Sequence, residues 1–436
     1  MKTLSTEEQK LLARVSWRLL PFLLVLYIVS YLDRINLSFA ALEMNAQLKF
    51  SDQVFSLGAG IFFLGYCLFG IPSNVVIKRL GPRRWISTIM VAWGIVTVAM
   101  CLVKDALTFY ILRFTLGATE AGFFPGMLLY LTFWFPPKQY GTAVARFMSA
   151  IPLAGLLGSF VAAKAFEING LWGLEGWKWL FIVTGVPAIA LGIAVLFLLP
   201  DRPHQARWLS DSQKSMLENL LAISGDEKSS ENKDEPQLSV VATLKNLVVW
   251  RFALLYFSTT VCMYGFQLWL PQIIKTFGSA TNNSNSLVAM LSAIPALMQA
   301  LGMLVIAASS DRSGERRYHV VASSAITVLG LVAATYLPDN LKLAGLSLAA
   351  FGIWGTVGPF WALTRGSLSV PAQPTGLAFI NSVGNLGGFV GPMLIGLIKH
   401  LTGSYAGGEF GSALLLLAST AVFTAFLAVT TKVQNK

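Results

Sequence analysis

Four ionisable side chains stand inside long apolar stretches of the sequence: Asp33 and Arg34 in the first stretch, and Arg113 and Glu120 in the fourth. Charged groups are costly in an apolar environment, so these are expected to face one another or a water-filled cavity. A buried arginine suits an anion, because its guanidinium group donates two parallel hydrogen bonds to a carboxylate and stays charged. A buried carboxylate suits reversible protonation.

The spacing of these residues indicates which of them can act together. On a helix, Arg113 and Glu120 share one face and lie about 10 Å apart along the axis. Asp33 and Arg34 are adjacent and point about 100° apart, so they cannot both face the same partner. Buried salt bridges that only hold helices together are the alternative, but intramembrane ionisable residues favour a site for ions and substrate. Arg34 shares a polar helical face with Tyr27, Tyr31 and Ser38.

The elements that carry these residues are predicted to be transmembrane helices. Of 436 residues, 55% are hydrophobic and 12% are charged, whereas soluble domains carry about a quarter charged residues. Apolar runs near the roughly 20 residues that cross a bilayer recur along the chain. An all-α membrane protein with twelve spans is predicted, at 17–40, 54–77, 84–103, 107–133, 143–166, 178–199, 250–274, 286–308, 318–337, 343–364, 375–398 and 410–431.

The basic residues predict the orientation of these spans. Between the predicted spans, 23 Lys and Arg lie on the side of the two termini and seven lie on the other side. Positive residues mark the cytoplasmic side, so the chain is expected in the cytoplasmic (inner) membrane with both termini on the cytoplasmic side. The net charge of +11 is therefore explained by topology and lipid contact, and no nucleic-acid partner is predicted. Glu7 and Glu8 argue against a cleaved signal, so the first span is expected to stay as an anchor.

No residue cluster predicts a metal site or another cofactor. The three cysteines fall in apolar spans, where small core side chains are expected, and the three histidines fall at span ends or in loops. Phosphate-binding loops and the HExxH and GxSxG motifs are missing, so no enzyme is predicted. These cysteines and histidines are Cys67, Cys101, Cys262, His204, His319 and His400.

A basic heptapeptide occurs twice, as KRLGPRR at 78–84 and as DRSGERR at 311–317, 233 residues apart. The same offset brings LAGLLG at 153–158 onto LGGFVG at 386–391. An internal repeat of two six-helix halves is typical of transporters that bind between the halves. The sequence therefore predicts an N-terminal half at 1–200, a cytoplasmic linker at 201–249 and a C-terminal half at 250–436.

Two kinds of segment are expected to connect or bend the spans. In the linker, Trp208 to Leu221 is predicted to form a short interfacial helix, and the polar stretch after it is predicted to be a solvated tether. Prolines inside spans are predicted to bend helices. These prolines are Pro125, Pro152, Pro295, Pro359 and Pro392.

Over essentially its whole length the chain resembles the major facilitator superfamily, and within it the anion:cation symporters. The stretches that carry the resemblance are YLDRINLSFA at 31–40, GIFFLGYCLFGIPSNVVIKRLGPRRW at 60–85, LRFTLGATEAGFFPG at 112–126 and FINSVGNLGGFVGP at 379–392. One departure is clear. The acidic residue that opens the basic loop motif is Asp311 in the second copy and is replaced by Lys78 in the first, which argues against a charge-relay gate at the first loop.

The resemblance implies roles for particular residues. It implies proton coupling by Asp33 and Glu120 and substrate-anion binding by Arg113. It also favours five ligand neighbours, Tyr31, Tyr66, Gln267, Trp361 and Asn381. From the residues themselves, Arg34 and Asn385 are further candidates, with Tyr264 and Trp354, because each places a polar group inside an apolar span.

The function predicted from these observations is import of a small organic anion with protons, by alternating access of two halves that work as a monomer. The proton is the coupling ion and no cofactor is expected. A sugar acid or a hydroxy carboxylate is the expected substrate, and an aromatic carboxylate is the nearest alternative. A drug or metabolite antiporter, a sensor that does not transport and a membrane-embedded enzyme are the other classes considered.

Overall fold

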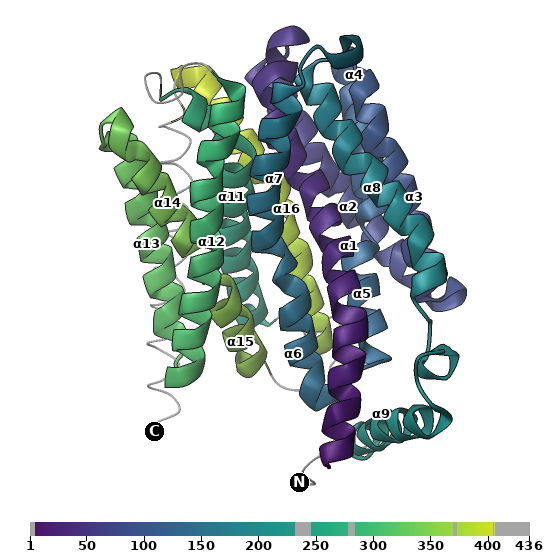
Figure 1. Cartoon of the computed structure of the whole chain (residues 1–436). Helices are drawn as coiled ribbons and strands as arrows, with labels where there is room; N and C mark the ends of the chain where they lie inside the picture. The colour runs from purple at the N-terminus through teal and green to yellow at the C-terminus, as the bar shows by residue number, and fades with distance from the viewer. Residues whose placement is uncertain (1–4, 232–245, 278–283, 369–372, 404, 406–436) are drawn as a thin grey trace, which may run out of the picture.

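The computed structural model of the chain describes residues 5–231, 246–277, 284–368, 373–403 and 405. These residues form a bundle of helices that run roughly alongside one another, without strands in the described ranges (Figure 1). The first half contains α1 (Thr6–Gln47), α2 (Asp52–Leu80), α3 (Pro82–Ala99), α4 (Ala106–Glu120), α5 (Phe123–Thr132), α6 (Pro137–Met148), α7 (Ala150–Glu167) and α8 (Gly176–Leu198).

Side-chain caps fix where several helices begin. Ser5 and Glu8 form a capping box at the start of α1, since each side chain bonds the backbone N–H of the other. Ser51 caps α2 through the backbone N–H of Val54, and Asp105 caps α4 in the same manner. These caps lie at the ends of apolar runs, so polar backbone groups are satisfied where each helix leaves the apolar layer.

The second half repeats the first. It contains α11 (Leu247–Lys275), α12 (Asn285–Ser313), α13 (Arg317–Tyr336), α14 (Asp339–Gly355), α15 (Val357–Ser367) and α16 (Gln373–Thr402). The offset of 233 residues maps both ends of α2 onto both ends of α12. Gly81 and Gly314, which follow these two helices, have φ values of +81° and +69° that favour glycine. The predicted internal repeat is therefore confirmed where the two copies are described.

Three predicted spans are built from two helices each, and proline explains every interruption. Proline has no N–H and leaves the carbonyl four residues before it without its helical partner. α4 gives way to α5 four residues before Pro125, α6 to α7 four residues before Pro152, and α14 to α15 four residues before Pro359. The two other predicted prolines, Pro295 and Pro392, lie inside the uninterrupted helices α12 and α16.

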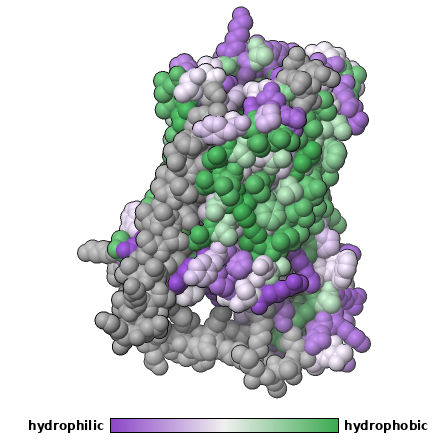
Figure 2. Space-filling model, turned by 90° about the vertical axis from the view of Figure 1, so that its left-hand side faces the viewer, coloured by the Kyte–Doolittle hydropathy of each residue, from purple (hydrophilic) through white to green (hydrophobic). Residues whose placement is uncertain are grey.

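Within the described residues, ten helical segments are long and apolar enough to cross a membrane. The predicted span 107–133 is present as the pair α4 and α5, which are too short to qualify singly. The predicted span 410–431 lies outside the described residues. An apolar band between two hydrophilic ends is visible on the face that Figure 2 shows. The all-α membrane fold is confirmed.

The linker begins at the end of the bundle where α1 begins. There α9 (Asp211–Glu231) lies across this lower end, beside the N-terminal turns of α1 (Figure 1). Trp208 stacks on Trp134, and Arg14 of α1 donates to Gln213. The linker helix predicted at Trp208 to Leu221 therefore starts three residues later than predicted. It also continues to Glu231, into the stretch predicted to be a tether.

Polar contacts between the halves gather at the end opposite the N-terminus. Lys399 of α16 forms an ion pair of 2.6 Å with Asp52 at the start of α2. Lys275 donates to the backbone carbonyl of Leu42, and Asn285 donates to the Glu43 carboxylate near the end of α1. Together these contacts hold the upper ends of the two halves against each other.

Candidate functional site

Arg34 and Glu120 form an ion pair near the middle of the bundle. The Nε atom of Arg34 lies 2.6 Å from Oε1 of Glu120. Ser30, one turn before Arg34 on α1, donates to the same oxygen over 3.0 Å. The Glu120 side chain is 1% exposed, and its other oxygen, Oε2, has no hydrogen-bond partner among the described residues. Glu120 is the last residue of α4, directly before the proline-induced interruption.

Arg113 is buried without a carboxylate partner in the described part of the chain. Its Nε atom donates to the Gly58 carbonyl over 3.2 Å, and its Nη2 atom lies 3.5 Å from the Ala59 carbonyl. Its Nη1 atom has no hydrogen-bond partner among the residues that the structure describes, and the residue is 1% exposed. Although Arg113 and Glu120 lie on one helix, Glu120 pairs with Arg34. Within the described residues, the hydrogen-bond acceptors of Arg113 are thus neutral carbonyl groups.

Both guanidinium groups line one narrow pocket between the halves. Its walls come from α1, α2 and α4 of the first half and from α11 of the second. A cation enclosed by such walls is poorly hydrated. The attraction between this cation and an anion in the pocket is therefore stronger than the attraction between the same charges in water. The lining residues are Arg34, Phe62, Phe63, Arg113, Tyr264, Gln267 and Leu268.

Two further predicted ligand neighbours lie beside this pocket. Tyr31 donates its hydroxyl hydrogen to Oε1 of Gln267 over 3.1 Å, which connects α1 with α11. The Tyr66 ring lies 4.9 Å from the Arg34 guanidinium carbon. The pocket thus joins predicted residues from both halves.

Three predicted ligand neighbours are not in the pocket lining. Trp361 lies on α15, where its ring packs edge-on against Tyr256 at 4.9 Å. Asn381 is exposed and Asn385 is half-buried on α16. All three are on the second half, which contributes to the lining through α11 alone.

The structure adds three apolar residues that the predicted site did not include: Phe62, Phe63 and Leu268. Phe62 lies one helical turn before Tyr66 and so shares its face, but this position alone does not indicate a role in the site. Nothing in the sequence distinguishes the two phenylalanines from ordinary packing residues. Their importance arises from the arginines of neighbouring helices.

Asp33 lies in a different environment from Arg34. Its Oδ1 atom accepts from Nδ2 of Asn36 over 3.3 Å, and the same Nδ2 atom donates to Thr184 of α8 over 2.9 Å. Trp93 and Thr97 of α3 also lie next to this carboxylate. Asp33 is fully buried, and its Oδ2 atom has no hydrogen-bond partner among the described residues. Asp33 therefore belongs to a polar cluster inside the first half, separate from the pocket.

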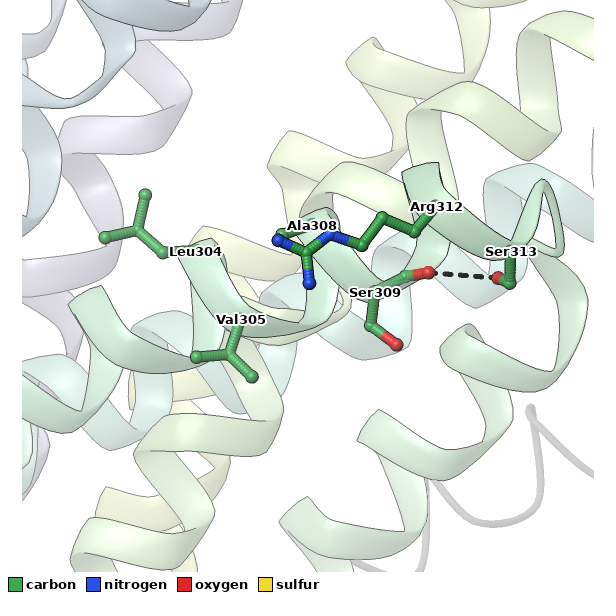
Figure 3. Close-up of a pocket in the computed structure, with 6 residues that line it drawn as sticks. All are labelled: Leu304, Val305, Ala308, Ser309, Arg312 and Ser313. Carbon is green, nitrogen blue, oxygen red and sulfur yellow. Dashed lines mark hydrogen bonds between the residues drawn. The ribbon is translucent and has the colours of Figure 1, made fainter.

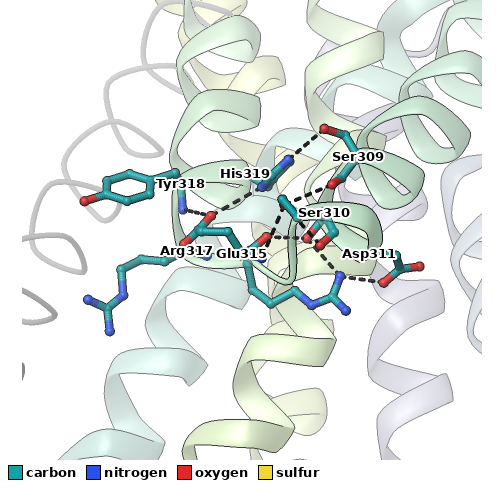
Figure 4. A network of polar contacts seen from close by, with 9 residues as sticks. Ser309, Ser310, Asp311, Glu315, Arg317, Tyr318 and His319 are labelled. Carbon is teal, nitrogen blue, oxygen red and sulfur yellow. Dashed lines mark hydrogen bonds and ion pairs between the residues drawn. The ribbon is translucent and has the colours of Figure 1, made fainter.

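The two basic loops are both held by a carboxylate, although Lys78 replaces the acidic residue in the first. There Asp201, which follows α8, accepts from the backbone N–H of Arg83 over 2.9 Å and lies 3.5 Å from its Nε. In the second loop Asp311 pairs with Arg316 at 2.5 Å, and Glu315 accepts from the first N–H groups of α13 (Figure 4). Asp201 of the linker thus supplies the first loop with a carboxylate, although Lys78 stands at the position equivalent to Asp311.

A larger hollow of about 680 Å³ lies along α12, away from this pocket. Arg312 extends over it, next to Leu304 and Ala308 (Figure 3). Gln299 faces α7 of the first half, beside Gly155. Ala308 is nine residues after Gln299, which is half a turn around the helix. The hollow is therefore on the outer face of α12, and it is not a candidate for a site between the halves.

Comparison with known sequences gives a consistent family. A family model described as Major Facilitator Superfamily matches residues 23–392. A protein of Agrobacterium vitis whose name refers to tartrate transport is 43% identical over 97% of this chain and 92% of that protein. A quinolone resistance transporter of Acinetobacter baumannii is 37% identical over 94% of this chain and 93% of that protein.

Solved structures share the fold at low sequence identity. A bacterial homologue of the human lysosomal transporter Spinster, inward-facing and unoccupied, has a TM-score of 0.75 at 18% identity, covering 97% of this chain and 98% of that one. The xylose transporter XylE of Escherichia coli, partially occluded and inward open, has a TM-score of 0.72 at 14% identity, covering 95% and 98%.

Proposed function

The chain belongs to the major facilitator superfamily, and we propose that it imports a small organic anion together with protons. The family and the relatives named above are membrane transporters, so this multi-pass membrane protein is a transporter and not an enzyme. The substrate, the coupling ion and the orientation in the inner membrane are parts of the proposal.

One observation carries the proposal: Arg113 is buried, has no carboxylate partner in the described ranges and lines a pocket between the halves. A buried cation with only neutral acceptors is unfavourable unless something supplies the opposite charge. A substrate carboxylate would supply it, through the planar fork of the guanidinium group. The substrate therefore completes an ion pair that the protein leaves open.

The second arginine favours a substrate with two carboxylates. Arg34 lines the same pocket as Arg113, so two guanidinium groups face one ligand. The relative from Agrobacterium vitis, named for tartrate transport, supports a hydroxydicarboxylate. Gln267 and Tyr264 add groups that bind hydroxyls. We infer a small hydroxydicarboxylate of the tartrate type.

The pair of Arg34 and Glu120 provides a way to couple protons to this substrate. In the structure the Glu120 carboxylate pairs with Nε of Arg34. When a proton neutralises Glu120, the ion pair is lost and Arg34 is free to bind the second carboxylate of the substrate. Proton and substrate then bind together. Protonation of Glu120 frees Arg34 for the substrate, and the substrate carboxylate replaces the Glu120 charge beside Arg34.

Asp33 is proposed as a second proton site. It has no ion-pair partner in the described part of the chain, where its Oδ2 atom, Oδ1 of Asn36 and the neighbouring donors Nε1 of Trp93 and Oγ1 of Thr97 are all buried without a hydrogen-bond partner. A proton on Oδ2 removes the uncompensated charge and turns one acceptor into a donor. Asp33 packs against α3 and α8. Its protonation state therefore affects how the helices of the first half pack against one another.

Movement of the halves is the proposed transport step. Residues 1–200 and 250–436 would rock about the pocket and open it to either side in turn, with 201–249 as the linker. The contacts of Lys399 with Asp52 and of Lys275 with Leu42 would open when the site faces outward. The proposal requires no cofactor other than the proton, and one chain holds the complete pocket, so a monomer suffices.

The charge distribution gives a prediction for topology. Both termini and the linker should be cytoplasmic, because the basic loop at Arg83 contacts the start of the linker, the linker helix contacts the first turns of α1, and basic loops mark the cytoplasmic side. A fluorescent or enzymatic reporter fused after Lys436 should be reached by an impermeant label only in permeabilised cells. Labelling in intact cells would place the termini outside and contradict the orientation.

Uptake by proteoliposomes tests the proposed function. Labelled tartrate should accumulate in vesicles that are more acidic outside than inside, and accumulation should stop when an uncoupler dissipates the gradient. An antiporter of this substrate would need the opposite gradient for uptake. Equal uptake with and without the gradient would contradict proton coupling, and absence of any uptake would contradict the substrate class.

An aromatic carboxylate is the second candidate, because one observation favours it. The rings of Phe62, Phe63 and Tyr264 line the pocket, and such rings stack on an aromatic ligand. An aromatic monocarboxylate would use Arg113 and leave Arg34 with Glu120. Competition between benzoate and labelled tartrate distinguishes the two, since a dicarboxylate site gives little inhibition by benzoate.

A further inference from the structure

We propose that Phe62 is a positioning residue that holds the guanidinium groups of Arg34 and Arg113 apart. In this arrangement each arginine meets its own carboxylate, so the site prefers an anion with two carboxylates to one with a single carboxylate. The inference rests on the proposed function, because it concerns the selectivity of the same pocket.

The Phe62 ring is the neighbour that the two cations share. The guanidinium carbon of Arg113 lies 4.9 Å from the ring centroid and that of Arg34 lies 5.8 Å from it. Both distances fall in the range at which a ring attracts a cation. Phe62 is 1% exposed, so water screens these interactions little.

The backbone of α2 fixes where this ring stands. In a helix the N–H of Phe62 bonds the Gly58 carbonyl, and that carbonyl also accepts from Nε of Arg113. Against the backbone of Phe62, α4 presents Gly117, where a Cβ atom would lie 1.9 Å from the Phe62 carbonyl oxygen. Only glycine allows this approach. The ring and Arg113 are thus held through the same turn of α2.

Neighbouring rings prevent Phe62 from turning away. Its centroid lies 5.2 Å from that of Phe63 and 6.1 Å from that of Tyr66, and the Tyr66 ring lies under Arg34. Two cations repel each other, and the attraction of both to the one ring that they share offsets part of that repulsion. With a flexible aliphatic side chain instead, both guanidinium groups are free to converge on a single carboxylate. A monocarboxylate would then be bound nearly as well as a dicarboxylate.

The test compares two ligands that differ in one group. Tartrate has two carboxylates, and threonate is the same four-carbon chain with one carboxylate replaced by CH2OH. By isothermal titration calorimetry, the wild-type protein should prefer tartrate. Phe62→Leu should lower the ratio of the two affinities about tenfold, because the attraction of the ring for both cations is lost. Phe62→Tyr keeps the ring and should keep the ratio.

Phe69→Leu is the matched control, since Phe69 is a 45% exposed aromatic residue on the same helix. It should leave the ratio unchanged. If Phe62→Leu does not fold, Phe62→Met replaces it, because methionine fills the space without a ring. A folded Phe62→Leu or Phe62→Met protein with the wild-type ratio overturns the inference. Failure of the wild-type protein to bind either acid overturns the proposed function instead.

Discussion

Arg113→Ala should abolish substrate binding while the protein keeps its melting temperature. The side chain is buried without a carboxylate partner in the described part of the chain, so its removal strands no opposite charge. Loss of the substrate's buried partner should weaken binding at least about a hundredfold. Calorimetry with tartrate measures the affinity, and thermal unfolding of the same samples measures the fold.

Two further variants make the prediction for Arg113 specific. Arg113→Lys keeps the charge but loses the planar fork, so binding should weaken about tenfold without vanishing. Arg84→Ala removes an exposed arginine from the first basic loop and should bind as the wild type does. Normal binding by Arg113→Ala would show that the anion is held elsewhere. Equal binding by Arg113→Lys and wild type would show that charge alone is used.

Glu120→Gln and Asp33→Asn should lose proton-driven accumulation and keep counterflow. An amide resembles the protonated acid, so the variant carrier still exchanges labelled for unlabelled substrate, but it no longer needs a proton. Uptake and counterflow are measured in proteoliposomes at several pH values. Undiminished proton-driven uptake by both variants would contradict the coupling proposal.

The two variants also separate coupling from scaffolding. Glu120 pairs with Arg34, and removal of one partner from a buried pair costs about 3 to 5 kcal/mol. Glutamine retains an oxygen for Arg34, so the loss should be smaller than for Glu120→Ala. Asp33 has no cation partner among the described residues, so Asp33→Asn should not lower the melting temperature. Its loss of proton drive in a stable protein would exclude a purely structural explanation.

The ionisable residues of the candidate site were predictable from the sequence, but their partners were not. Ionisable residues are rare inside apolar spans, so Asp33, Arg34, Arg113 and Glu120 were identified from their positions in the sequence. Periodicity tells which residues share a face on one helix, and it correctly separated Asp33 from Arg34. It does not tell how helices turn toward one another. The pairing of Glu120 with Arg34 and the isolation of Arg113 therefore required the packing of α1, α2 and α4.

Bends and loops show the same limit. All five prolines were predicted to bend helices. Pro125, Pro152 and Pro359 follow an interruption of the helix, whereas Pro295 and Pro392 lie inside continuous helices. Proline removes one hydrogen bond, and the surrounding packing decides whether a helix continues past it. The second basic loop opens with the carboxylate of Asp311, and the first basic loop has Lys78 at the equivalent position. The structure supplies the first loop with a carboxylate from Asp201, which is 123 positions further along the chain.

The repeat has a consequence for how such a protein can diversify. The offset of 233 residues places Leu346 and Ile353 where the first half has Arg113 and Glu120, so the ionisable groups are inherited by one copy only. The other copy contributes neutral walls, Tyr264, Gln267 and Leu268. Under the proposed function, substitutions in those walls should change which substrate is bound and should leave the proposed proton site at Glu120 in place. The two halves would then carry substrate selectivity and proton coupling separately, and selection could act on one without changing the other.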